Sequence, residues 1–271
     1  MTSREERMVK ILVDLKENYN VIGVKAEFEA EGTRLEEALR LKEVVTKANL
    51  DLTIKIGGCE ALKDMYDARS IGTTKIVAPM VESAYAMKKY VFSFKKAFTE
   101  EERKKMKFLI NVETFQTIQN IDEILESEYI ADIDGFVLGR VDLTGSLGLS
   151  RDDINSERVF DAIYPVFQKA KAKGLLCAIG GGVSKESLPF FEALPKGTPD
   201  YFETRKVLFK CPEALGPKGA AGILKAVGFE LMWLKNKKDF YGMIYNEDST
   251  RIKMLEKRYK QLIEEAGGYV S

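Results

Sequence analysis

The chain has 271 residues, of which 45% are hydrophobic and 31% are charged, a composition that excludes disordered, collagen-like and disulfide-scaffold proteins. Its 42 lysines and arginines balance its 42 aspartates and glutamates, so no overall charge attracts it to nucleic acid or anionic lipid. The chain contains no histidine, which excludes imidazole metal ligands and histidine-activated nucleophiles.

Cysteine usage and hydropathy predict the compartment. The three cysteines are widely spaced and form no zinc motif, as expected where thiols stay reduced. No apolar run approaches the roughly 20 residues of a membrane span. Residues 1–7 are charged and lack the apolar core of a signal peptide. We therefore expect a cytoplasmic protein that binds neither membranes nor nucleic acid.

Helical and strand-like segments alternate along most of the chain. A capping box of Ser3 and Glu6 predicts the first helix, and one of Thr33 and Glu36 predicts the second. Further helices are predicted near 58–70, 82–98, 115–127, 156–173 and 184–194. The predicted strands are 21–30, 52–56, 75–80, 108–114, 135–139, 175–179 and 201–208.

Repeated strand and helix units are typical of parallel strands joined by right-handed crossovers. About seven such units favour an α/β fold of the (β/α)₈ TIM barrel type over an open sheet. Because the sequence shows seven strands instead of eight, we expect one weak strand or an irregularity near the first strand.

The pattern changes after residue 211. A loop at 216–222 precedes helical patterns, the last of which aligns Ile252, Leu255, Tyr259 and Leu262 in one apolar stripe. We predict a barrel domain at 1–211 and a C-terminal helical extension at 212–271, which packs on the barrel or on a neighbouring subunit. Because the stripe needs a covering surface, we expect a homo-oligomer.

Charged side chains occur within strands that otherwise read as buried. Glu113 ends one strand with the parity that faces the barrel interior, and Lys55 does so in another. Lys25, Glu27 and Glu29 share one parity in the first strand. Active sites of TIM barrels lie at this end of the strands. An internal lattice of salt bridges without chemistry is the alternative interpretation.

Three further segments carry polar groups or glycines. Residues 139–146 place Asp142 among small residues after a strand, which suits an anion near the backbone and a cation on the carboxylate. The glycines at 180–182 either cradle a phosphate or carboxylate or let a helix and a strand pack closely. Arg205 lies in the last predicted strand, where the facing of its charges stays open, and we include it among the substrate-binding residues.

Three blocks resemble a known family. They are Lys-Ile-Val-Ala-Pro-Met-Val-Glu-Ser-Ala at 75–84, Ile-Asn-Val-Glu-Thr at 110–114 and Gly-Phe-Val-Leu-Gly-Arg-Val-Asp-Leu-Thr-Gly-Ser at 135–146. In this order, they resemble the HpcH/HpaI aldolase and citrate lyase β-subunit family of the phosphoenolpyruvate/pyruvate barrel superfamily. The likeness covers roughly residues 50 to 150.

The resemblance implies a (β/α)₈ barrel that makes or breaks carbon–carbon bonds through an enolate held on a divalent metal. The implied metal ligands are Glu113 and Asp142, with Mg²⁺ or Mn²⁺ as the ion. The backbone of Gly139, Arg140 and Val141 corresponds to the family's carboxylate cradle. Asn111 matches a polar substrate-binding position of the family.

The chain departs from the family at the base and at the enolate-stabilising position. Alanine at residue 30 stands where the aldolases carry a histidine base, and Lys55 stands where they carry an arginine. Lys55 is then expected to stabilise negative charge. The proton would be moved by a metal-bound water or by a carboxylate such as Glu27 or Glu29. Glu82 could order such a water or cap the next helix.

Two enzymatic functions and one binding function follow. The first is a class II type aldolase or lyase that takes a 2-oxo acid and a polar, sugar-like aldehyde. The second is an acyl-thioester lyase, whose substrates need no histidine of the aldolase type. The third is a barrel that has lost catalysis and binds a metabolite, which the missing histidine favours and the pair of carboxylates opposes.

Overall fold

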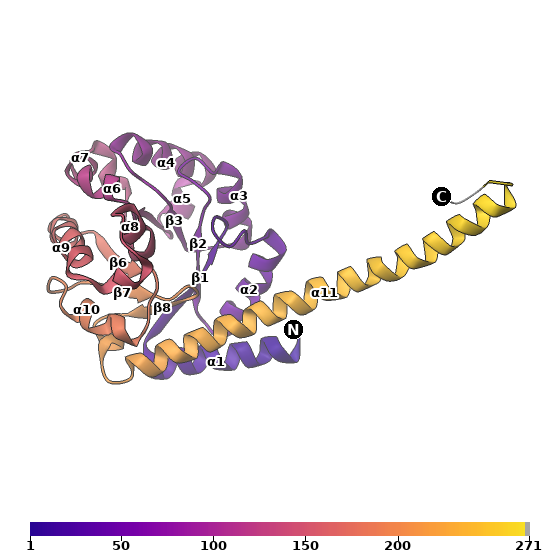
Figure 1. Ribbon diagram of the computed structural model, residues 1–271. Coiled ribbons are helices and arrows are strands. Elements are labelled where there is room, and N and C mark those ends of the chain that lie inside the picture. Colours follow the sequence, from indigo (N-terminus) through magenta and orange to yellow (C-terminus); the bar gives the residue numbers. More distant parts are fainter. Residues whose placement is uncertain (269–271) are drawn as a thin grey trace. The chain divides into compact units, whose positions relative to one another are not determined.

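The computed structural model describes residues 1–268, and within them eight strands form a closed barrel in the order β1 to β8 (Figure 1). The barrel predicted from the alternating pattern is therefore confirmed. The strands are β1 Val21–Glu27, β2 Asp51–Lys55, β3 Lys75–Ala78, β4 Lys107–Val112, β5 Gly135–Gly139, β6 Leu176–Gly180, β7 Tyr201–Glu203 and β8 Val207–Lys210.

Helices follow most strands and lie around the barrel (Figure 1). They are α1 Ser3–Tyr19, α2 Leu35–Lys47, α3 Leu62–Ile71, α4 Ala84–Ala97, α5 Glu100–Arg103, α6 Phe115–Gln119, α7 Ile121–Glu126, α8 Arg140–Ser146, α9 Glu157–Ala172 and α10 Leu188–Glu192. A further helix, α11 Gly219–Glu265, follows β8. Short 3₁₀ turns occupy Glu128–Asp132, Arg151–Asn155, Lys185–Ser187 and Glu213–Leu215.

The starts of the first two helices differ from the predicted capping boxes. Thr2, and not Ser3, caps α1: its hydroxyl accepts a hydrogen bond from the Glu5 amide at 3.2 Å, and the Glu5 carboxylate accepts one from the Thr2 amide at 2.7 Å. Helix α2 begins after Arg34, two residues beyond the predicted start at Thr33. In both places the N-cap of the helix is the residue next to the predicted one, because adjacent residues can each cap a first helical turn.

The barrel is irregular where its last strand meets its first. The segment predicted as one strand at 201–208 is a hairpin of β7 and β8, in which the amide of Thr204 donates to the carbonyl of Val207 at 2.9 Å. Strand β8 also pairs antiparallel with β1, and the register shifts between Val21 and Gly23. The reversal at 204–206 reads Thr-Arg-Lys, without glycine or proline, so no turn signal marks it in the sequence.

One apolar side chain from each of β3 to β8 packs in a common buried cluster: Val77, Leu109, Val137, Ala178, Tyr201 and Leu208. Because side chains alternate along a strand, the residues two and four positions after Leu109 share its side of the sheet. Those residues are Asn111 and Glu113. The same alternation that fills the core thus places polar groups at the carboxyl end of β4.

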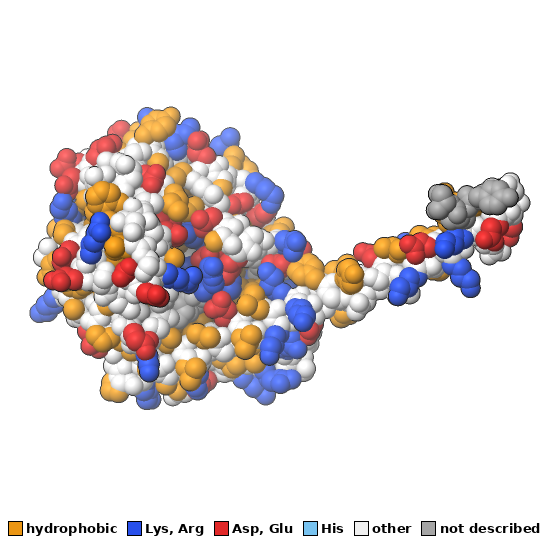
Figure 2. Space-filling model, in the orientation of Figure 1, with side chains coloured by type: hydrophobic (Ala, Val, Ile, Leu, Met, Phe, Trp, Pro, Cys, Tyr) orange, Lys and Arg blue, Asp and Glu red, His pale blue; other side chains and the backbone are white. Residues whose placement is uncertain are grey.

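The chain forms two compact units, Met1–Glu230 and a second that begins at Leu231. Helix α11 is continuous from Gly219 to Glu265, although the sequence predicts a loop at 216–222 and separate helical stretches. Figure 2 shows acidic and basic side chains interspersed over the visible face of the barrel. Among the described residues, no helix is both long enough and apolar enough to cross a membrane.

Candidate active site

A cavity of about 430 Å³ lies at the carboxyl ends of the barrel strands. It brings together nearly all the residues that the sequence singles out. Its lining comprises Lys25, Glu27, Glu29, Ala30, Lys55, Asn111, Glu113, Val137, Gly139, Val141, Asp142, Arg151, Gly180, Gly181, Gly182, Val183, Glu203, Thr204, Arg205, Val227 and Glu230.

Glu113 is the most buried carboxylate of this lining, at 1% exposure. Its Oε1 accepts a hydrogen bond from the Met80 amide at 3.0 Å, and its Oε2 accepts one from Asn111 Nδ2 at 2.5 Å. Lys55 Nζ lies 3.3 Å from the same Oε2 and 2.9 Å from Glu29. Burial raises the pKa of Glu113 above its usual value despite the nearby Lys55 ammonium.

Lys55 stays protonated in this setting. Burial opposes its charge, but the carboxylates of Glu113 and Glu29 outweigh burial and raise the pKa of Lys55 above its ordinary value. A protonated amine is a hydrogen-bond donor and not a nucleophile. The side chain is thus suited to stabilise negative charge on a ligand.

A second buried ion cluster lines the same cavity and joins β1 with β7. Lys25 contacts Glu203 and lies 3.0 Å from Glu27, whose other oxygen lies 3.3 Å from Arg205. Although burial lowers the pKa of Lys25, Glu203 and Glu27 raise it above its usual value. Arg205 is half-exposed, so its guanidinium lies at the rim of the cavity. This cluster contains Glu203. The sequence pattern did not decide which side of its strand Glu203 faces, and in the structure it lines the cavity.

The backbone after β5 lies against the glycines after β6. A Cβ atom on Gly181 would lie 2.7 Å from the Val141 nitrogen and 2.8 Å from the Arg140 nitrogen. Glycine therefore keeps the approach to these two amides open. Gly139 has a similar role, because a Cβ there would lie 2.8 Å from Glu113 Oε2.

The side chain of Arg140 supports the loop that follows β6. It is fully buried, and its guanidinium donates to the carbonyls of Gly180 and Gly181 at 3.2 and 2.9 Å and to Ser187 Oγ at 3.0 Å. It also stacks 4.7 Å from the ring of Phe191. The guanidinium of Arg140 thus braces the β6 loop, and Arg140 is not among the described residues that line the cavity.

The carboxylates of this cavity suit a divalent cation. Within the described residues, four basic and six acidic side chains line it, which leaves a surplus of two negative charges. Asp142, exposed at the start of α8, adds to the repulsion that raises the pKa of Glu113. No group of three or more His, Cys, Asp or Glu residues gathers as a metal site in residues 1–268. Two carboxylates still fit Mg²⁺, which keeps several water or substrate ligands.

One predicted catalytic residue lies outside the cavity lining. Glu82 accepts a hydrogen bond from Thr114 Oγ1 at 2.6 Å, and its backbone carbonyl accepts one from Asn120. It therefore fixes the segment that follows Glu113. The sequence did not indicate three further lining residues, Arg151, Val227 and Glu230. They lie in a 3₁₀ turn and in α11, and no local sequence pattern places these segments near the strand ends.

The sequence model of the HpcH/HpaI aldolase/citrate lyase family matches residues 33–183, more than half of the chain. The chain belongs to this family. The match contains Glu113, Asp142 and the β5 and β6 loops, so the family assignment covers most of the cavity just described. No curated protein sequence matches the chain.

Several solved structures share the fold of this chain. An HpcH/HpaI aldolase/citrate lyase family protein from Burkholderia cenocepacia J2315 aligns with a TM-score of 0.55 at 14% identity, over 68% of this chain and 79% of that one. The HpcH/HpaI aldolase from Desulfitobacterium hafniense DCB-2 aligns with 0.55 at 16% identity, over 68% and 76%. Citrate synthase SbnG aligns with 0.59 at 16% identity, over 86% and 90%.

Proposed function

We propose that this protein is a metal-dependent carbon–carbon lyase of the class II aldolase type, which acts on pyruvate or a related 2-oxo acid. The observation that carries the proposal is the cavity in which Glu113 and Asp142 accompany a surplus of two negative charges. Without a cation, this surplus would repel an anionic 2-oxo acid. The family consists of aldolases and lyases, which generally depend on a divalent metal.

Glu113 and Asp142 would hold the ion, with Mg²⁺ or Mn²⁺ as the best match to carboxylate ligands. When bound, the cation supplies Lewis acidity toward the oxygens of a 2-oxo acid. Asn111 orients Glu113 through its 2.5 Å hydrogen bond, and the Met80 amide fixes the other carboxylate oxygen. The protein thus presents a carboxylate whose position is fixed before an ion binds.

The substrate carboxylate would lie on the amides of Arg140 and Val141, to which Gly181 leaves access. Lys55, protonated between Glu29 and Glu113, donates to the developing oxyanion of the substrate. Glu29 is half-exposed beside Lys55 and is the carboxylate that we assign to accept the C3 proton. Arg205 at the rim would contact the outer part of the second substrate.

The second substrate is a polar aldehyde in this proposal. Among the described residues, Asn111 Oδ1 and Glu203 Oε2 are buried acceptors without a hydrogen-bond partner. Both residues line the cavity, and a buried acceptor is costly unless a donor reaches it. Hydroxyl groups of a sugar-like aldehyde would supply such donors.

An acyl-thioester lyase is the second candidate function. The absence of histidine favours it, because the aldolases of this family use a histidine base and the thioester branch does not. One solved structure with this fold is a citrate synthase. A metabolite-binding barrel without turnover is the non-catalytic candidate.

The test measures exchange of the pyruvate C3 hydrogens in deuterated water and decarboxylation of oxaloacetate, with Mg²⁺, with Mn²⁺ and with a chelator. We expect activity with either ion and its loss on chelation. Glu113→Gln and Asp142→Asn should each reduce the rate at least about 100-fold. Asp122→Asn, a substitution of an exposed carboxylate that pairs with Lys169, is the control and should retain full activity.

Different results separate the candidates. Activity on acyl-thioesters, with none on pyruvate or oxaloacetate, would support the thioester lyase. Binding of pyruvate without exchange under any metal would support the non-catalytic barrel. Full activity of both carboxylate variants, or activity that persists in chelator, would contradict the metal-dependent aldolase.

A further inference from the structure

Helix α11 carries a heptad repeat along its distal part. Starting at Leu231, residues spaced alternately by three and four positions form one stripe. Eight of these ten residues are apolar or aromatic, and the two exceptions are Lys238 and Asp248. The heptad stripe comprises Leu231, Leu234, Lys238, Tyr241, Tyr245, Asp248, Ile252, Leu255, Tyr259 and Leu262. This spacing is the signature of helices that pair in a coiled coil.

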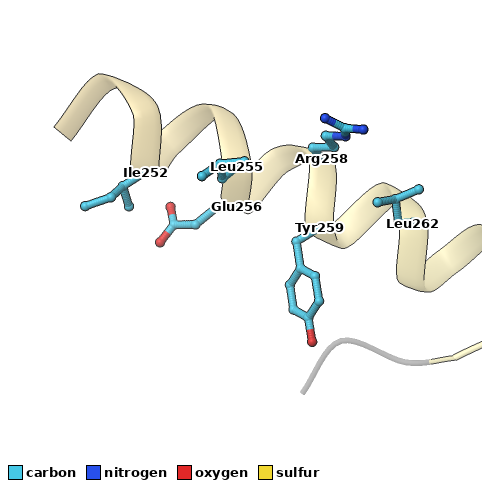
Figure 3. A pocket seen from close by; sticks show the side chains of 6 residues that line it. All are labelled: Ile252, Leu255, Glu256, Arg258, Tyr259 and Leu262. Carbon is cyan, nitrogen blue, oxygen red and sulfur yellow. The ribbon is translucent and has the colours of Figure 1, made fainter. Parts of the chain in front are cut away.

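The apolar residues of this stripe other than Tyr241 are exposed to solvent. About half of each side chain is accessible in Leu231, Leu255 and Leu262, and more in Tyr259. Figure 3 shows Ile252, Leu255, Tyr259 and Leu262 along this helix, where they line a shallow pocket together with Glu256 and Arg258. Figure 2 also shows hydrophobic side chains on the surface of its visible face. A helix of this length with such a stripe gains most of its stability by burying the stripe against a partner.

We propose that this stripe pairs with the same stripe of a second copy of the chain, in antiparallel orientation, aligned so that the two Met243 residues lie at the same level along the paired helices. Residues equally far before and after Met243 then face each other. Lys238 lies five positions before Met243, and Asp248 lies five positions after it. Each polar residue of the stripe therefore meets its opposite charge in the second copy, and this happens twice in the dimer.

Every other layer of this pairing is apolar or aromatic. Tyr241 faces Tyr245 of the second copy, and Leu234 faces Ile252. The further layers are Leu231 with Leu255, Val227 with Tyr259 and Leu224 with Leu262, and Val227 and Leu224 are themselves exposed. Phe240, Met243 and Met254 lie on other faces of the helix and stay outside this contact.

A parallel pairing in register lacks this complementarity. It would place Lys238 against Lys238 of the second copy and Asp248 against Asp248, giving two layers of like charge inside an apolar contact. Like charges that face each other at an interface weaken association strongly. The two polar residues thus decide the orientation as well as the register.

A charge-swap series on the full-length protein tests both features, with the dimer dissociation constant measured by analytical ultracentrifugation. Lys238→Asp and Asp248→Lys each create two layers of like charge in the antiparallel dimer, and each should raise the constant at least about tenfold. The double variant restores opposite charges and should return it to within about threefold of the original. In a parallel dimer all of these proteins keep layers of like charge, so the single variants would not weaken it.

Two neighbouring substitutions separate the stripe from the rest of the helix. Leu255→Glu lies on the stripe, whereas Met254→Glu introduces the same charge one residue away, on a side chain that is 61% exposed. We expect the Leu255 variant to sediment at the monomer mass of 30.6 kDa and the Met254 variant to remain a dimer. Circular dichroism of both variants confirms that the barrel remains folded.

The proposal does not depend on the chemistry of the barrel, because every readout is the mass of the protein without substrate or metal. A full-length protein that stays monomeric at all concentrations would overturn it. So would a dimer that tolerates Leu255→Glu or that ignores the single charge changes. Binding of the monomer to vesicles of phosphatidylcholine and phosphatidylserine would assign the stripe to a lipid surface instead.

Discussion

Lys55 Nζ and Glu113 Oε2 lie 3.3 Å apart, although β2 and the end of β4 are separated in the barrel by β3. Both side chains are almost fully buried. The pair therefore spans β3 inside the barrel and links the proposed metal ligand Glu113 to the ammonium group of Lys55. Breaking a buried pair on one side leaves an uncompensated charge, which is far more costly than the loss of a surface pair.

The first prediction concerns this pair. Lys55→Met should remove most of the C3 exchange of pyruvate, because the ammonium that donates to the developing oxyanion of the substrate would be lost. Lys55→Arg should keep part of it, since the charge remains on a different shape of side chain. The methionine variant should also lower the free energy of unfolding by about 3 kcal/mol. Urea unfolding and exchange rates check the two effects, and equal rates for both variants would refute the charge argument.

The second prediction tests the access that Gly181 leaves to the amides of Arg140 and Val141. Gly181→Ala places a Cβ 2.7 Å from the Val141 nitrogen, so we expect the KM for the 2-oxo acid to rise at least about tenfold. Gly197→Ala is the matched control, because Gly197 has a φ of +82° against +84° for Gly181 but has open space around its Cβ position. Gly197→Ala should lose about 1 kcal/mol of stability through backbone strain, and Gly181→Ala should lose more, because its Cβ also clashes with backbone atoms. A normal KM in the Gly181 variant would contradict the assignment of this cradle.

The third prediction is a pH dependence at Glu27. Burial opposes the charge of Glu27, but Lys25 together with Lys55 and Arg205 more than compensates, and the pKa of Glu27 is lowered. A lowered pKa in the folded state gives stability that is present above the usual carboxyl pKa and is lost as the pH falls through the lowered value. Glu27→Gln should therefore reduce the free energy of unfolding most at neutral pH, and the difference should shrink below about pH 4.

Urea unfolding at several pH values measures this difference. Glu213→Gln is the control, because the pKa of Glu213 is also lowered, by its hydrogen bond with Lys210, but its side chain is exposed. Its variant should unfold almost like the original protein at every pH. A Glu27 variant whose effect does not change with pH would show that the carboxylate contributes packing and not charge.

The fourth prediction concerns Arg140 as a brace. Arg140→Met fills a similar volume but leaves the carbonyls of Gly180 and Gly181 without their guanidinium donor. We expect a loss of about 3 kcal/mol of stability and a weaker carboxylate site, because the β6 loop loses its anchor. Arg140→Lys should recover little, since an ammonium cannot form the same fork. Thermal unfolding monitored by circular dichroism distinguishes these outcomes from a substrate contact, which would affect KM alone.

The sequence alone determined the class of fold, the family and the place where charge gathers. Strand and helix units of this spacing favour a barrel in which the parallel strands share one carboxyl edge. Alternation along β4 then sends Asn111 and Glu113 to the same side as Leu109, and similar alternation brings Lys25 and Lys55 to that place. These are local properties of a strand, so a linear pattern suffices to find them.

Only the tertiary structure decided which charge pairs with which. Lys25 pairs with Glu203, a partner 178 positions away, and Lys55 pairs with Glu113. No local pattern distinguishes these choices, because they depend on how the barrel closes and on the short reversal between β7 and β8. The same holds for Arg140, whose guanidinium donates hydrogen bonds to carbonyls of the β6 loop. Inside a protein, where water does not supply a donor, a carbonyl without a hydrogen bond is costly.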